Sequence, residues 1–339
     1  MVDTLQDARA GSTRALYNRR WGHFERWCLA QSPQVDPFRA SVEDVLRFLQ
    51  SKLDDGRRPS TLRGWVAAIT ACHEGMGGQP LSQHSLIADF QRGARRRCPA
   101  SRPLFPSWEL AVVLEALCEP PFEPIESLEL KFLGLKTLLL VALTTAKRVS
   151  DLQALSVSSE CLRFDGEGRR ALLKPNLAFV PKNLLVALNP VELVAFHPPP
   201  FSSTEEERLH CLCPVRALQC YVQKTAGLRQ TSQLFVTHGP GRGAGRAAAR
   251  PTLSRWLVEA IRLAYSSKGL DPPEGIRAHS TRGASTSWAV TRGVSIQEVC
   301  MAANWASSST FATFYRLDVA APTVAHAVLG VADASVQGI

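Results

Sequence analysis

The chain has 339 residues, of which 45% are hydrophobic, so its composition favours a globular protein and its length favours two domains. The longest apolar run, residues 137–146, is too short to cross a bilayer, and we therefore expect no membrane segment. The formal net charge of +9 favours a polyanionic partner, and it is spread along the chain, because residues 1–100 carry 15 Lys and Arg against 10 Asp and Glu.

The cysteines indicate the redox compartment. There are nine, an odd number, and they are scattered through a chain without a signal-peptide pattern, which predicts reduced thiols in the cytosol or nucleus. His210-Cys211-Leu212-Cys213 contains metal-ligand residue types, but it lacks a second well-spaced pair and Pro214 follows it as a helix-start residue. We therefore expect no metal site.

The first hundred residues predict a compact bundle of helices. A hydroxyl cap at Ser12 precedes an apolar stripe, Ser41-Val42-Glu43-Asp44 opens a second helix, and Pro59 opens a third, before a short fourth over residues 85–96. Three prolines within residues 99–106 then forbid a continuous helix. We therefore predict an N-terminal helical domain over residues 1–98, a linker rich in proline and arginine over 99–106, and a second domain over 107–339.

The second domain is predicted to be mainly helical with a small antiparallel sheet. Helices are expected at residues 108–117 and 128–146, and the latter is apolar almost all round and therefore central. Arg148 follows in a turn before a helix that the capping pattern from Ser150 to Gln153 starts. Later segments give three short strands at 160–164, 169–173 and 183–188, then helices at 214–225, 252–266, 279–290, 295–304 and 308–317.

Five residues of the second domain suit an attack on a phosphodiester: Arg148, His279, Arg282, Trp305 and Tyr315. Such an attack moves charge onto the non-bridging oxygens, and without a metal that charge must be met by fixed cations. Guanidinium groups suit this task because they stay protonated and donate two parallel hydrogen bonds. His279 and Arg282 are three residues apart at a predicted helix start, so both side chains project from one face.

Tyr315 is the candidate nucleophile. A phenol has a free pKa of about 10, so a reactive tyrosine needs cationic neighbours or a base within reach, and His279 can exchange protons near neutral pH. Of the other tyrosines, Tyr17 and Tyr221 fall at apolar helical positions and Tyr265 ends a helix remote from the arginines.

A leaving 5′ oxygen also needs a proton, which a lysine on a hairpin can supply. Lys182 and Lys174 are both available for this role. We prefer Lys182, because it lies beside a predicted turn and strand rather than on a strand interior.

The order and spacing of these residues resemble those of the tyrosine recombinase (phage integrase) family over about residues 12–330. The similarity is greatest to the eukaryotic DIRS-like retrotransposon branch, whose markers here are Pro59-Ser60-Thr61-Leu62-Arg63-Gly64, Phe179-Val180-Pro181-Lys182, Leu212-Cys213-Pro214-Val215-Arg216-Ala217-Leu218 and the His279-to-Arg282 motif. Two departures are visible. The step from Trp305 to Tyr315 is one residue longer than in many members, and Thr144-Thr145-Ala146-Lys147-Arg148 replaces the common Thr-Gly-x-Arg form.

The resemblance implies a role for each site residue. Tyr315 would form a 3′-phosphotyrosyl bond while Arg148 and Arg282 clamp the scissile phosphate. Lys182 would be the general acid for the 5′ hydroxyl, and His279 the general acid and base. Trp305 would occupy the place usually held by a second histidine, where its indole N–H still donates a hydrogen bond.

The resemblance also implies an architecture and an assembly. The N-terminal core-binding domain and the catalytic domain would close as a C-shaped clamp on double-stranded DNA. The expected DNA-binding residues of the N-terminal domain are Arg63, Arg92, Arg95, Arg96 and Arg97. An apolar tail at residues 319–330 docks on a neighbouring protomer in the family, which implies a homotetramer on paired DNA sites, although the same tail could pack in cis.

We therefore expect a nuclear, site-specific DNA recombinase or integrase that serves the integration of a transposable element. It would need no metal, ATP or other cofactor, because the phosphotyrosyl bond conserves the energy of the broken one. Two alternatives remain: a catalytically silent DNA-binding protein derived from a transposon, and a type IB topoisomerase-like enzyme. The compact N-terminal bundle and the tail argue against the topoisomerase.

Overall fold

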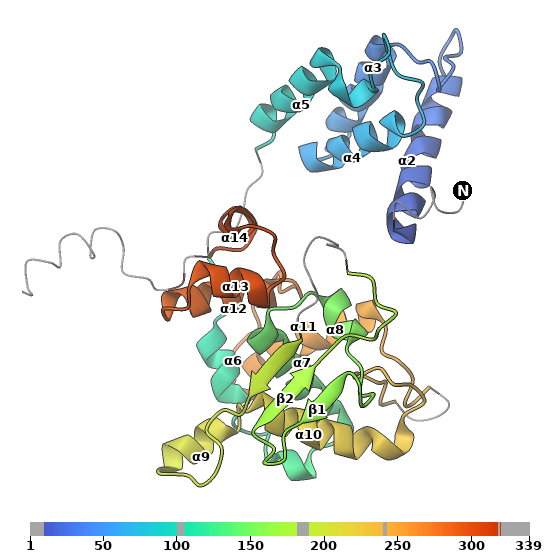
Figure 1. Ribbon diagram of the computed structural model, residues 1–339. Coiled ribbons are helices and arrows are strands. Elements are labelled where there is room, and N and C mark those ends of the chain that lie inside the picture. Colours follow the sequence, from blue (N-terminus) through green and yellow to red (C-terminus); the bar gives the residue numbers. More distant parts are fainter. Residues whose placement is uncertain (1–9, 100–104, 182–189, 240–242, 318, 320–339) are drawn as a thin grey trace, which may run out of the picture. The chain divides into compact units, whose positions relative to one another are not determined.

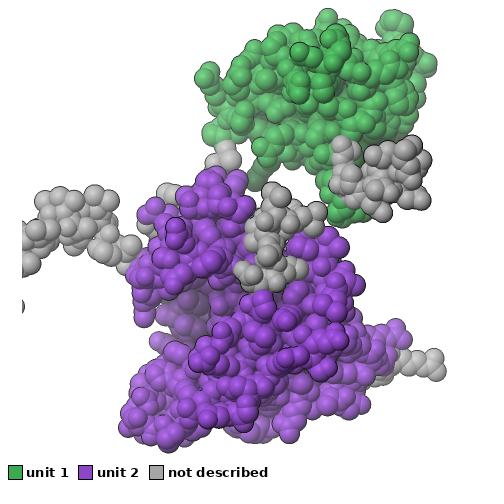
Figure 2. Space-filling model, viewed as in Figure 1, with its two compact units in different colours: residues 1–102 green, residues 103–339 purple. Residues whose placement is uncertain are grey.

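The computed structural model describes residues 10–99, 105–181, 190–239, 243–317 and 319. Contacts divide the chain into two compact units, Met1–Arg102 and Pro103–Ile339, which we call unit 1 and unit 2 (Figure 2). The division falls inside residues 99–106, the range that the sequence predicts as a linker, of which residues 100–104 lie outside the described part. Within the described ranges, no helix is both long and apolar enough to cross a membrane.

Unit 1 is a bundle of helices around an aromatic core. Phe48 makes edge-to-face contacts with Phe24 and Trp65, whose ring centroids lie 5.1 and 6.1 Å away. The predicted cap at Ser41 is present, since its hydroxyl accepts from the Asp44 N–H, whereas the first helix begins after Ala10 rather than after the predicted cap Ser12. The helices are α2 (Gly11–Leu29), α3 (Val42–Asp54), α4 (Pro59–Thr70) and α5 (Ser85–Arg97).

Unit 2 is built around one central helix, α7 (Leu130–Thr145), as its all-round apolar pattern predicts (Figure 1). Helices α10, α11 and α12 pack against it, and α12, α13 and α14 group together at the C-terminal end of the described chain. The other helices of unit 2 are α6 (Leu110–Ala116), α8 (Val149–Ala154), α9 (Thr204–His210), α10 (Pro214–Thr225), α11 (Arg250–Ser267), α12 (Ser280–Thr291), α13 (Ile296–Ala302) and α14 (Ser308–Phe314).

A small antiparallel sheet completes unit 2, in the order β1 (Leu162–Phe164), β2 (Arg170–Leu173), β3 (Val191–Val194). Leu162 pairs with Leu173 across the first two strands, so the predicted hairpin is confirmed. The strand predicted at 183–188 lies outside the described residues, and the third described strand comes later in the chain. The mainly helical fold with a small antiparallel sheet is therefore as predicted.

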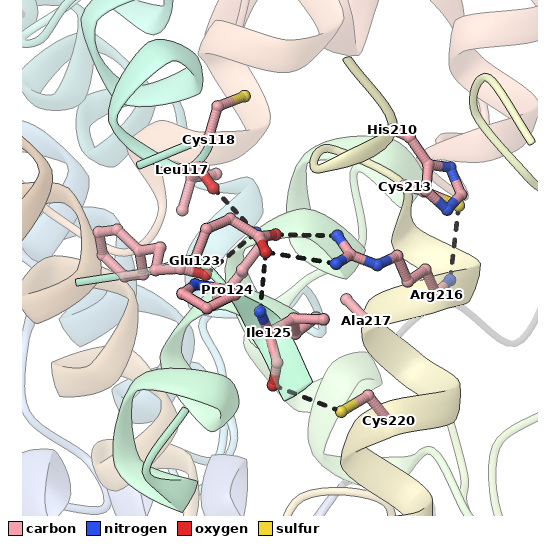
Figure 3. Close-up of polar contacts among 12 residues, drawn as sticks. Leu117, Cys118, Glu123, Pro124, Ile125, His210, Cys213, Arg216, Ala217 and Cys220 are labelled. Atoms are coloured by element: carbon pink, nitrogen blue, oxygen red, sulfur yellow. Dashed lines mark hydrogen bonds and ion pairs between the residues drawn. The ribbon is translucent and has the colours of Figure 1, made fainter. Parts of the chain in front are cut away.

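A buried ion network joins the start of unit 2 to α7 and α10 (Figure 3). The fully buried Lys136 on α7 forms an ion pair with Glu123 and donates to the Leu117 carbonyl at 2.8 Å. Arg216 on α10 donates to both carboxylate oxygens of Glu123, at 2.9 and 3.3 Å. Arg216 belongs to the Leu212-to-Leu218 motif, and in this structure it orients α10.

Candidate active site

A left-handed turn delivers Arg148 to the start of α8. Helix α7 ends where Ala146 adopts φ +48°, and Arg148 then occupies the N-cap position of α8. The Asp151 carboxylate accepts from the Arg148 backbone N–H at 3.3 Å and lies 4.0 Å from Nη1 of the same residue. The N-cap of α8 is thus Arg148, two residues before the predicted position at Ser150. The Asp151 carboxylate both caps the helix and orients the Arg148 guanidinium.

The left-handed turn carries a testable strain, since Ala146 stands where the common Thr-Gly-x-Arg form has glycine. A residue with a Cβ pays a cost of about 1–2 kcal/mol for this conformation, whereas glycine does not. We therefore expect Ala146→Gly to raise the free energy of unfolding by about 1 kcal/mol, measured by urea denaturation. Ala142→Gly, in the regular helix one turn earlier, should lower the free energy of unfolding by about 1 kcal/mol. If both variants lower it equally, Ala146 is not strained.

Arg282 is a buried cation with unused donors. Only 1% of the residue is exposed, and its Nη2 donates to the Ala303 carbonyl at 2.7 Å. Its Nε and Nη1 have no hydrogen-bond partner among the described residues. Burial lowers the pKa of Arg282 to about 10, so the group stays protonated at neutral pH. A protonated guanidinium with two free N–H groups is a site for an anion.

Tyr315 lies directly against the candidate base. Its Oη is 2.9 Å from Nε2 of His279, and the two ring centroids are 5.2 Å apart. Tyr315 is half-buried while His279 is exposed, so the reacting pair is open to a substrate. The structure therefore brings together the two residues that the sequence assigned to nucleophile and base, across 36 positions of the chain.

Close packing on α12 fixes the position of Tyr315. The Ser287 hydroxyl donates to the Tyr315 carbonyl at 3.2 Å and accepts from the Leu317 N–H at 2.8 Å. A Cβ added at Gly283 would lie 3.2 Å from Leu317 and 3.4 Å from the Tyr315 carbonyl, so the segment fits tightly over this glycine. These contacts set the register of the tyrosine even though its distance from Trp305 in the chain is unusual.

Trp305 packs beside both reacting groups. The centroid of its ring lies 4.4 Å from the centroid of the Tyr315 ring. The guanidinium carbon of Arg282 lies 4.9 Å from the same Trp305 centroid. The indole Nε1 is buried and has no hydrogen-bond partner in the described part of the chain. Ala146 belongs to the same buried cluster, so the turn that carries Arg148 packs against the segment that carries Trp305. The indole is thus a further donor available to a bound anion.

The remaining tyrosines of unit 2 are committed to the core. Tyr221 is fully buried and its hydroxyl accepts from the Val236 N–H at 3.0 Å. Tyr265 is 6% exposed, and its hydroxyl accepts from the Glu109 N–H at 2.7 Å. Neither lies beside a histidine in the described contacts, so Tyr315 is the tyrosine that the geometry favours.

Several predicted site residues lie elsewhere. Lys182 lies outside the described residues, and the alternative Lys174 is half-buried directly after β2. The arginines predicted to bind DNA are all exposed on α4 and α5 of unit 1: Arg63, Arg92, Arg95, Arg96 and Arg97. Arg92 forms an ion pair with Asp89. Within the described ranges, no three His, Cys, Asp or Glu side chains gather as metal ligands.

The sequence analysis missed two residues of this region, Lys147 and Asn304. Lys147 Nζ donates to Asn304 Oδ1 at 3.0 Å, and both residues are buried. A lysine beside an arginine in a predicted turn indicates a solvated charge. No pattern in the sequence predicts its contact with a residue 157 positions away.

No protein-family model matches the chain, and a search of curated proteins finds no relative by sequence. Solved structures do match. The Tn1549 transposon integrase in complex with transposon right end DNA aligns with a TM-score of 0.59 and 12% identity, covering 92% of this chain and 91% of that one.

Two other proteins align at similar levels. A lambda integrase dimer bound to a COC′ core site gives a TM-score of 0.54 and 15% identity, with 91% and 73% of the two chains covered. XerH site-specific recombinase bound to a palindromic difH substrate gives a TM-score of 0.50 and 13% identity. The alignment covers 88% of this chain and 74% of that one. At these identities the likeness concerns the fold. The chain therefore has the fold of the tyrosine recombinases and integrases.

Proposed function

We propose that this chain is a site-specific DNA recombinase or integrase that cleaves and rejoins DNA through a 3′-phosphotyrosyl intermediate. The observation that carries the proposal is the 2.9 Å contact between Tyr315 Oη and His279 Nε2, beside a buried guanidinium with two unused donors. A nucleophile, a base and an anion site are the minimum that a metal-independent phosphoryl transfer needs. The fold shared with integrases that are solved on DNA supports the same reaction class.

The chemistry follows from these positions. His279 Nε2 accepts the phenolic proton as Tyr315 Oη attacks the scissile phosphorus, and the bond to the 5′ oxygen breaks. The negative charge on the non-bridging oxygens is met by Arg148, by the free donors of Arg282 and by the indole N–H of Trp305. Lys182, or alternatively Lys174, supplies the proton to the leaving 5′ oxygen. Attack by a 5′ hydroxyl on the phosphotyrosyl bond reverses the steps and rejoins a strand.

The charge balance of the site favours a phosphodiester as its occupant. Among the described residues, no carboxylate lies within ion-pair distance of Arg282, and Asp151 is the carboxylate near Arg148. A buried cation without a counter-ion is costly, and a bound phosphate removes that cost. The same guanidinium lies 5.1 Å from the centre of the Tyr315 ring, where it stabilises negative charge that develops on the phenol.

The proposal extends to partners and setting. Unit 1 would add phosphate contacts through its exposed arginines on α4 and α5, so that both units bind one duplex as a clamp. The tail at residues 319–330, of which 320–330 lie outside the described residues, would join protomers into a homotetramer on paired DNA sites. The DIRS-like markers in the sequence favour an enzyme of a eukaryotic retrotransposon that acts in the nucleus.

Covalent trapping of the native chain tests this function. The probe is nicked suicide DNA with a 5′-bridging phosphorothioate, pooled from candidate element termini, in the presence of a chelator. We expect an adduct that survives denaturation and that maps, after digestion, to the peptide containing Tyr315. DNA binding without any adduct would support the catalytically silent DNA-binding protein, and an adduct on another tyrosine would overturn the site. Relaxation of plasmid DNA by a monomer, without recombinant products, would support the topoisomerase-like alternative.

A further inference from the structure

A buried lysine lies in the turn between α7 and α8, next to Arg148. Lys147 is 7% exposed, and its Nζ donates to Asn304 Oδ1 at 3.0 Å. Among the described residues it has no carboxylate within ion-pair distance. Burial lowers the pKa of Lys147 to about 8, while the nearby charge of Asp151 opposes that shift. An ammonium placed in the interior against a neutral partner is costly, so its presence needs a reason beyond stability.

The Lys147–Asn304 hydrogen bond connects two left-handed turns. Ala146 has φ +48° and Asn304 has φ +51°, and neither is glycine. Such conformations persist where the surrounding structure holds them, and they concentrate at functional sites. Here one turn leads directly into Arg148 and the other leads directly into Trp305.

The second turn also contacts Arg282. The carbonyl of Ala303, the residue before Asn304, accepts from Arg282 Nη2 at 2.7 Å. A single side-chain bond thus spans the segment that sets Arg148 and the segment that sets both Arg282 and Trp305. The two segments are 157 residues apart in the chain, and they share a buried apolar cluster through Ala146 and Trp305.

We propose that Lys147 and Asn304 are positioning residues of the phosphate site, whose hydrogen bond holds Arg148 and Arg282 in the spacing that lets both address one phosphate. This inference rests on the proposed function. The ammonium of Lys147 also adds a third cation to the site beside Arg148 and Arg282, and its charge is complemented when a phosphate binds. Groups that act together on one reacting centre must be held within about 0.5 Å, so a loosened turn reaches the chemistry.

Four variants test the inference. Lys147→Met keeps the length of the side chain and removes the ammonium, and Asn304→Gly keeps the left-handed turn and removes the acceptor. The double variant reports whether the two residues act through their bond. Lys136→Met is the matched control, because Lys136 is a fully buried lysine on α7, about 15 Å along the helix from the turn that carries Lys147.

The primary measurement is the single-turnover rate of adduct formation at saturating DNA. Ordinary suicide DNA is compared with the 5′-bridging phosphorothioate, whose sulfur leaves without a proton donor. We expect each single variant to cleave about a hundredfold more slowly on both substrates. The double variant should be no slower than the slower single variant. Lys136→Met should keep the native rate although its melting temperature falls.

Three results would overturn the inference. A native rate for Lys147→Met would show that the bond does not position the site. Rescue of Lys147→Met by the sulfur substrate would make Lys147 a proton donor rather than a positioning residue. Losses that multiply in the double variant would show that Lys147 and Asn304 act independently.

A second measurement separates this inference from the proposed function. If the native chain forms no adduct, the proposed function fails, and the anion site is then probed with inorganic phosphate by thermal shift. Here we expect the phosphate dissociation constant to rise about tenfold in Lys147→Met, with no change in Lys136→Met. Equal phosphate affinity in the native chain and Lys147→Met would count against the inference without reference to DNA cleavage.

Discussion

Tyr315→Phe will abolish the covalent protein–DNA adduct, with a rate loss of roughly a factor of 100,000 or more. The substitution removes the single atom that lies 2.9 Å from His279 Nε2 and keeps the ring. That ring packs 4.4 Å from Trp305 and under the Arg282 guanidinium, so the variant should fold and bind DNA as the native chain does. Denaturing gel electrophoresis of the trapped complex, with binding measured separately by mobility shift, gives the two readouts.

Tyr265→Phe is the matched control for this experiment. The Tyr265 hydroxyl accepts from the Glu109 N–H at the start of α6, so its loss removes one hydrogen bond and costs about 1 kcal/mol of stability. Adduct formation should nevertheless continue at the native rate. An adduct that persists in Tyr315→Phe would show that another residue is the nucleophile.

Arg282→Met will change activity and stability in opposite directions. We expect the single-turnover cleavage rate to fall by about a thousandfold or more, because the variant loses the fixed cation that meets the phosphate charge. At the same time the free energy of unfolding should rise by about 1 kcal/mol, because methionine fills similar space without a buried charge. The basis for the second expectation is that the guanidinium is 1% exposed and leaves Nε and Nη1 without partners among the described residues.

Arg216→Met provides the contrast. Arg216 is half-buried, and its guanidinium donates two hydrogen bonds to Glu123, which keeps Lys136 as an ion-pair partner when they are removed. This variant should lose about 2 kcal/mol of stability, and the fraction of the protein that is folded should retain the native cleavage rate. Urea unfolding measures the stability of both variants, and adduct kinetics measure their cleavage rates. If Arg282→Met proves as unstable as Arg216→Met, the Arg282 guanidinium is a structural group.

The central helix and the histidine–arginine pair could be predicted because they depend on local pattern. Apolar residues on every face of α7 indicate a helix buried on every side. The three-residue spacing of His279 and Arg282 places both at the start of α12, where the structure has them. In both cases the periodicity of a helix contains the information.

The parts that could not be predicted depend on contacts between distant segments. The register of Tyr315 is set by Gly283 and Ser287 on α12, and no spacing in the sequence shows that fit. The Lys147–Asn304 bond and the Arg216–Glu123 pair join residues 157 and 93 positions apart. The roles of these residues follow from their partners, and the partners appear only in the folded chain.

The burial of Arg282 has a consequence for the order of events on DNA. The guanidinium carbon lies 4.9 and 5.1 Å from the ring centroids of Trp305 and Tyr315, and only 1% of the residue meets solvent. An anion therefore reaches its free donors only after one of these rings has shifted. Helix α14 has seven residues, too few to be stable without tertiary contacts, so a change in those contacts moves Tyr315 at its C-cap. Docking of the scissile phosphate and movement of the nucleophile from its resting position are then coupled, and any anion that binds this guanidinium must first displace the rings that cover it.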